Sequence, residues 1–141
     1  ALTQQHKHLK EMKKITGINK EPLFSPIICD YYSGMVMSVP FYTDMLHNVK
    51  GVEDVHAMLS KFYEGQKFVK VMPLDAQAGE GNMLAGNGCS GWDGLKIFVT
   101  GNEERIVLSS QFDNLGKGAS GAAIQCLNIV LGCEEDKGLV L

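Results

Sequence analysis

Residues 113–132 of this 141-residue chain read DNLGKGASGAAIQCLNIVLG, directly after a run at 105–112 that predicts a strand. The glycines predict a turn that opens a helix and whose backbone amides are free to face a ligand. Gly116, Gly118 and Gly121 spell G-x-G-x-x-G, a pattern typical of dinucleotide-binding loops. We reject that interpretation, because a Rossmann unit needs a second parallel strand and an acidic residue after the helix, and the sequence beyond Gly132 is too short for them.

The helix predicted over residues 119–131 is apolar around almost its whole circumference. Gln125 and Asn128 are its only strongly polar residues, whereas a surface helix normally shows a single apolar stripe. We therefore expect this helix to pack on most sides, against another domain or another subunit outside these residues.

The motif from Asp113 to Gln125 resembles the terminal motif of the N-acetyl-gamma-glutamyl-phosphate reductases, which are relatives of aspartate-semialdehyde dehydrogenase. Three further segments agree in the same order. Residues 7–12 resemble the family's Lys-His-Leu-Pro-Glu-Met, residues 32–40 its glycine-methionine strand, and residues 68–73 the strand after its middle helix. The resemblance implies an α+β fold in which a mixed, mainly antiparallel sheet carries helices on one face, similar to the glyceraldehyde-3-phosphate dehydrogenase C-terminal-like domain.

The resemblance also implies a reaction, the reduction of N-acetyl-gamma-glutamyl phosphate to its semialdehyde with NADPH in arginine biosynthesis. This chemistry needs a thiolate, a hydride donor and a proton donor. His8 matches the family's acid/base histidine, and Asn114, Lys117 and Gly118 match a turn at the domain boundary beside the nicotinamide end of NADP. The family's nucleophilic cysteine and NADP-binding domain should precede residue 1, so we expect this chain alone to be inactive and the helix in 113–132 to pack on that domain.

The residues themselves allow simpler roles and show two departures from the family. By spacing alone, His8 is a solvated helix histidine, and Asn114 and Lys117 form a helix cap with a solvated lysine. Lys10 stands where the family has proline, and Ser33 stands where many relatives carry an arginine. An anchoring charge for a substrate carboxylate or phosphate is therefore not assumed at Ser33.

Composition and cysteine usage predict one soluble, cytoplasmic domain over residues 1–141. The resemblance implies that this domain serves substrate binding and dimerisation. The chain is 45% hydrophobic and 21% charged, with a net charge of −3 and no basic cluster, so we expect no nucleic-acid partner. No apolar run approaches the length of a membrane span. The four cysteines form no C-x-x-C pair, and we expect buried free thiols at Cys29 and Cys126. Cys89 follows Asn-Gly but lacks an adjacent base, so we expect it not to be the nucleophile.

The remaining pattern predicts two helices and a sheet. The helices span residues 2–16 and 52–64, the strands span 23–29, 35–40 and 68–72, and a hairpin spans 95–110 around Gly101-Asn102. On the first helix, His6 and His8 would point to opposite faces, and no metal site is predicted. Residues 74–92 are glycine-rich and should be either mobile or part of a functional surface.

Two alternatives from other classes stay open. One is a non-catalytic dimerisation module that uses the apolar helix as its contact. The other is part of an aspartate-semialdehyde dehydrogenase, in which the Asp-Asn-Leu motif recurs, although residues 7–9 and 33–36 favour the acetylglutamyl enzyme.

Overall fold

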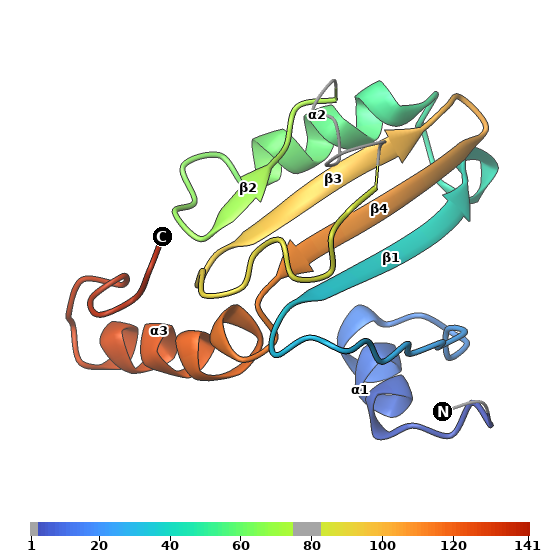
Figure 1. Ribbon diagram of the computed structural model, residues 1–141. Helices are drawn as coiled ribbons and strands as arrows, with labels where there is room; N and C mark the ends of the chain where they lie inside the picture. The colour runs from blue at the N-terminus through green and yellow to red at the C-terminus, as the bar shows by residue number, and fades with distance from the viewer. Residues whose placement is uncertain (1–2, 75–82) are drawn as a thin grey trace. The chain divides into compact units, whose positions relative to one another are not determined.

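The chain folds into two compact units, Ala1–Asp30 and Tyr31–Leu141, in a computed structural model that describes residues 3–74 and 83–141. The first unit holds α1, and the second holds the sheet and the other helices (Figure 1). The elements are α1 (Lys7–Thr16), β1 (Met35–Tyr42), the short helix η1 (Thr43–Met45), α2 (Val52–Phe62), β2 (Val69–Val71), β3 (Leu95–Gly101), β4 (Arg105–Phe112), the π-helical turn η3 (Gly116–Ser120) and α3 (Gly121–Val130).

The sheet has four strands in the order β1-β4-β3-β2. β1 and β3 both pair antiparallel with β4, and β2 pairs parallel with β3. The hairpin between β3 and β4 turns at Asn102, whose Oδ1 accepts hydrogen bonds from the backbone N–H groups of Glu104 and Arg105. This mixed, mainly antiparallel sheet confirms the predicted α+β class and the predicted hairpin.

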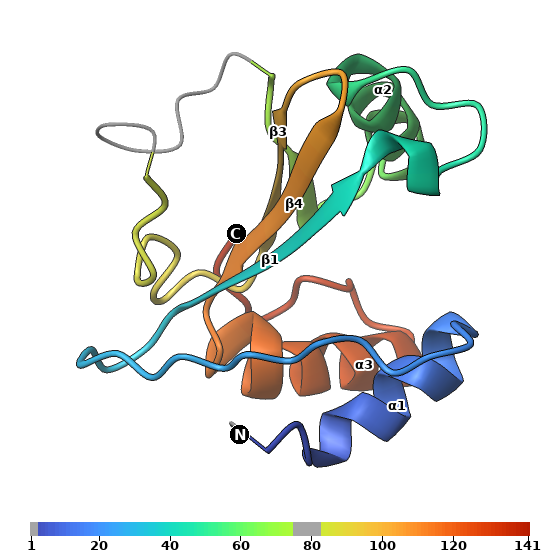
Figure 2. The ribbon, with the colours of Figure 1, turned by 90° about the vertical axis from the view of Figure 1, so that its right-hand side faces the viewer.

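One face of the sheet is covered by α2. Val55, Val99 and Ile106 are at most 3% exposed and form the core between them, with Val52 and Leu59 packed against it. Figure 2 shows α2 on one side of the strands and the loop at 83–94 on the other side. The rest of the predicted glycine-rich segment, residues 75–82, lies outside the described residues.

The first helix is shorter than predicted. α1 begins at Lys7, because His6 has an extended backbone and its Nδ1 caps the helix by accepting a hydrogen bond from the N–H of His8. The two imidazole rings therefore lie 4.6 Å apart between centroids, and the prediction that they point to opposite faces is wrong. Leu2 lies outside the described residues. Gly17, in the left-handed conformation, ends the helix as predicted.

The strand predicted at 23–29 is absent from the described part of the chain. Leu23, Ile27 and Ile28 are 85–97% exposed, and two prolines, Pro22 and Pro26, remove backbone donors that a strand needs. Burial of the two thiols was also predicted wrongly, because the cysteines at 29 and 126 are both exposed. All four cysteines are free. Among the described residues, no helix has the length and apolar character that crossing a bilayer requires.

Candidate functional site

The carboxylate of Asp113, which follows β4 directly, organises the glycine-rich turn. It is 4% exposed and accepts hydrogen bonds from Gly91 N (2.6 Å), Ser33 Oγ (3.1 Å), Leu115 N (2.8 Å) and Gly116 N (3.2 Å). Burial opposes ionisation, but these hydrogen bonds outweigh it and hold the pKa of Asp113 below its ordinary value. One carboxylate thus joins three segments of the second unit.

The turn's backbone amides are largely engaged within the chain, so the expectation that they are free is wrong. Besides the two amides bound to the Asp113 carboxylate, Gly118 N donates to Asp113 O at 2.8 Å and Ser120 N donates to Leu115 O at 2.9 Å. The start of the helix therefore binds the chain's own oxygens in the place where a dinucleotide loop binds phosphate. This geometry supports the rejection of the dinucleotide interpretation.

Asn114 connects the turn to the start of β1. Its Oδ1 accepts a hydrogen bond of 2.7 Å from Gly34 N. Gly34 has a φ of +122°, and a Cβ there would lie 2.4 Å from Gly86 O, so only glycine fits this approach. Asn114 therefore joins two segments 80 residues apart, a contact that a simple helix cap does not make.

Lys117 is held against the protein, and the solvated lysine of the simpler interpretation is not observed. Its Nζ donates to Gln125 Oε1 at 2.5 Å and lies 4.8 Å from the centroid of the Phe68 ring. Gly118, the next residue, is exposed. The structure thus brings the three predicted cofactor residues together on one turn, with Lys117 already positioned by two neighbours.

His8 belongs to the first unit, and the turn residues belong to the second. It is the second residue of α1, it is exposed, and its ring lies 6.4 Å from the Phe24 ring between centroids. The residue is open to solvent, as contact with a substrate would require.

Cys89 has the environment of a structural thiol. It is 4% exposed, its Sγ donates to Gln111 Oε1 at 3.5 Å, and burial raises its pKa. These features support the interpretation that it is not the nucleophile. Within the residues that the structure describes, no group of three or more histidine, cysteine or acidic residues could hold a metal ion.

Sequence reasoning did not identify the residues that hold this turn. Asp113 was quoted as the first residue of the motif but was given no role, and Ser33 was noted only for the charge it lacks. An acidic residue at the end of a predicted strand, followed by glycines, was the available signal. Its partners Ser33 and Gly91 lie 80 and 22 residues away in the sequence, and nothing in the sequence around them indicates this contact.

The chain belongs to the semialdehyde dehydrogenase family, because residues 1–114 match the family model described as "Semialdehyde dehydrogenase, dimerisation domain". The four-stranded α+β sheet is consistent with the glyceraldehyde-3-phosphate dehydrogenase C-terminal-like fold expected for this domain.

Among curated proteins, the chain is similar to N-acetyl-gamma-glutamyl-phosphate reductases. It is 39% identical over 138 residues to N-acetyl-gamma-glutamyl-phosphate reductase 2 of Nostoc sp., a match that covers 95% of this chain. It is 38% identical over 133 residues, or 93% of this chain, to the reductase of Brucella ovis. In both cases the chain spans 43% of the relative's length.

Proposed function

We propose that these 141 residues form the substrate-binding and dimerisation part of an NADPH-dependent N-acetyl-gamma-glutamyl-phosphate reductase of arginine biosynthesis. The observation that carries the proposal is the 39% identity over 95% of the chain to a reductase of that name. The substrate is then N-acetyl-gamma-glutamyl phosphate, and the enzyme is cytoplasmic. The nucleophilic cysteine and the main NADP-binding residues lie in sequence outside these 141 residues.

In this proposal, His8 supplies the proton that the reduction needs. The enzyme's thiolate displaces phosphate from the acyl group, NADPH supplies a hydride when bound, and the resulting oxyanion takes a proton from the imidazole of His8. The exposure of His8 at the start of α1 supports this role, because the ring is accessible to a substrate.

The turn at Asn114, Lys117 and Gly118 contacts the nicotinamide end of the cofactor in this proposal. The residues fit an amide-bearing ring better than a phosphate, because Asp113 occupies the amides of Leu115 and Gly116. Asn114 Oδ1 is bound to Gly34 N, so its amide NH2 group is the end directed away from that contact. The exposed backbone of Gly118 allows close approach by the ring.

Exposed apolar residues on α3 support docking of the NADP-binding domain on this helix. Ile124 and Leu127 are 39% and 54% exposed, and Val130 and Leu131 are 81% and 65% exposed. A helix with so much uncovered apolar surface is expected to be buried by a partner. In this proposal, the NADP-binding domain of the same enzyme is the partner that covers α3.

Self-association is the second part of the proposal. The family description names a dimerisation domain. The edge strand β1 also leaves Met35, Met37 and Val39 between 42% and 48% exposed, at alternate positions and therefore on one face. An apolar row of this kind suits a second copy of the chain, in agreement with a homo-oligomeric enzyme.

A chimaera tests the proposed activity. In it, residues 1–141 replace the segment of the Nostoc sp. relative that they match. We expect the isolated chain not to oxidise NADPH with N-acetyl-gamma-glutamyl phosphate, and the chimaera to do so. Aspartyl phosphate should be a poor substrate, which distinguishes the related dehydrogenase. Turnover by the isolated chain, or a folded chimaera without activity, would contradict the proposal.

A further inference from the structure

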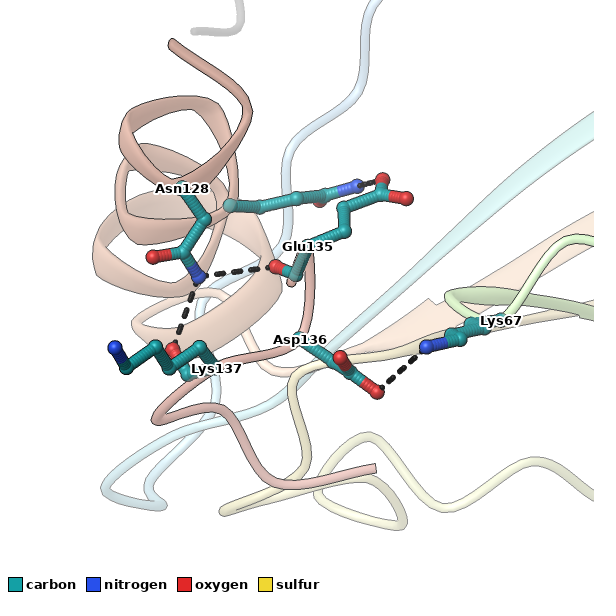
Figure 3. Close-up of polar contacts among 6 residues, drawn as sticks. Lys67, Asn128, Glu135, Asp136 and Lys137 are labelled. Carbon is teal, nitrogen blue, oxygen red and sulfur yellow. Dashed lines mark hydrogen bonds and ion pairs between the residues drawn. The ribbon is translucent and has the colours of Figure 1, made fainter. Parts of the chain in front are cut away.

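Residues 133–141, called the C-terminal strap here, are fixed at three places in the second unit. Figure 3 shows Asn128 donating from Nδ2 to two strap carbonyls, those of Glu135 (3.0 Å) and Lys137 (2.9 Å). Asn128 is 7% exposed, and both of these contacts are partly buried. Figure 3 also shows the ion pair between Lys67 and Asp136, at 3.1 Å. The third place is Val140, which is hydrogen-bonded to Asp93.

The end of the strap pairs with Asp93, two residues before β3. Val140 N donates to Asp93 Oδ2 at 3.0 Å, and Asp93 N donates to Val140 O at 2.8 Å. The strap is therefore held to α3, to the segment before β2 and to the segment before β3. The hydrogen bond from Asn128 to the carbonyl of Glu135 fixes the backbone from which the Glu135 side chain extends.

The side chain of Glu135 in the strap is connected to Lys117 of the glycine-rich turn through Gln125 on α3. Gln125 Nε2 donates to Glu135 Oε1 at 2.6 Å, and Gln125 Oε1 accepts from Lys117 Nζ at 2.5 Å. A carboxylate only accepts hydrogen bonds and an ammonium only donates them. The Gln125 amide can satisfy both neighbours in one orientation only. Glu135 therefore selects the orientation that presents the oxygen to Lys117.

We propose that Gln125 and Glu135 are positioning residues that fix the ammonium of Lys117 for the cofactor-bearing domain. This inference rests on the proposed function, which places Lys117 beside the cofactor. A free lysine side chain has several rotatable bonds and occupies many positions. Here two hydrogen bonds in series and the ring of Phe68 hold one of them before any ligand arrives, which lowers the entropic cost of binding.

Lysine labelling of the 141-residue chain tests the positioning itself. An amine-reactive reagent, followed by mass spectrometry of the Lys117 peptide, reports how free this ammonium is. We expect labelling of Lys117 to be several-fold faster in Glu135→Ala and Gln125→Leu than in the parent. Asp136→Asn is the matched control, because it breaks the neighbouring Lys67 ion pair without touching Gln125. Unchanged labelling in both variants, or equal acceleration in the control, would overturn the inference.

The Michaelis constants of the chimaera test the consequence for function. Glu135→Ala should raise the KM for NADPH about tenfold, the cost of one lost charge-assisted hydrogen bond, while kcat changes little. Glu135→Gln keeps the shape of the side chain and should raise the KM for NADPH by a smaller factor. This second variant gives a result even if the alanine variant folds poorly. Faster labelling with an unchanged KM would show that the hydrogen bonds joining Lys117, Gln125 and Glu135 have only a structural role, and would overturn their role in cofactor binding. An inactive parent chimaera would instead refute the proposed function. The labelling result alone would then decide whether Gln125 and Glu135 position Lys117.

Discussion

At the scale of single residues, Asp113 determines whether the turn forms, because one buried carboxylate satisfies four donors from three segments. Asp113→Asn removes the charge and places an NH2 group against a donor. We expect it to lower the free energy of unfolding at pH 7 by about 2 kcal/mol, measured by urea denaturation. Asp44→Asn, at an exposed acidic residue, is the control and should change stability little.

The same substitution should change the dependence of stability on pH. Folding lowers the pKa of Asp113 below the ordinary aspartate value of about 3.9, so its contribution is complete above that pH. The contribution is lost as pH falls through the lower, folded-state pKa. The parent should therefore lose stability more steeply below pH 4 than the Asp113→Asn variant does. Parallel curves for the two proteins would show that the carboxylate does not act in this way.

The local chemistry of the turn was predictable only in part. The motif identified Asn114, Lys117 and Gly118, and the structure brings them together on one turn. The partners of Asn114 and Lys117 were not predictable, because Gly34 and Phe68 lie just before β1 and β2, and only the folded sheet brings these distant segments near the turn. Lys117 illustrates the limit. A lysine in a glycine-rich turn is normally solvated, and the acceptor that holds it here is on the following helix.

At the scale of elements, the start of α3 depends on a close contact between glycine and the segment before β3. A Cβ at Gly121 would lie 2.2 Å from Asp93 Oδ1 and 2.9 Å from the backbone of Gly116. Helix propensity alone would make Gly121→Ala stabilising by about 1 kcal/mol. We expect the opposite, a loss of roughly 1–3 kcal/mol in thermal or urea unfolding, because the backbone must shift.

Gly118→Ala provides the comparison for this contact. Its new Cβ would first meet the edge of the Phe112 ring at 3.2 Å, a contact that a small ring movement relieves. It should therefore cost less than the change at Gly121. If Gly121→Ala proved the more stable of the two variants, the close approach of Asp93 would not constrain α3 in solution.

Element prediction succeeded where periodicity and turn chemistry agreed. The β3–β4 hairpin and α2 were predicted from alternating and helical spacing, and both are observed. The strand predicted at 23–29 is not observed. The prediction gave more weight to the apolar residues than to Pro22 and Pro26, which remove backbone donors. On α2, Phe62 is 74% exposed although it continues the apolar stripe of Val55 and Leu59. The sequence shows which residues share a face but not where the sheet beneath them ends.

At the scale of the whole molecule, the chain contributes two regions to the proposed enzyme, each in a different compact unit. The first unit carries His8, and the second carries the glycine-rich turn and the exposed apolar surface of α3. The chain spans 43% of the length of the Nostoc sp. relative, and the proposed function assigns the thiolate and most cofactor contacts to sequence outside it. Under that proposal, His8 is the catalytic group that these residues supply.

The most direct measurement is therefore the turnover of the chimaera with and without His8→Asn, followed by NADPH oxidation with N-acetyl-gamma-glutamyl phosphate. General acid/base groups contribute about 10²- to 10⁴-fold, so kcat should fall within that range while folding is unchanged. His6→Asn, two residues earlier, is the matched control and should retain most activity. Equal turnover by the His8→Asn variant and its parent would contradict the account.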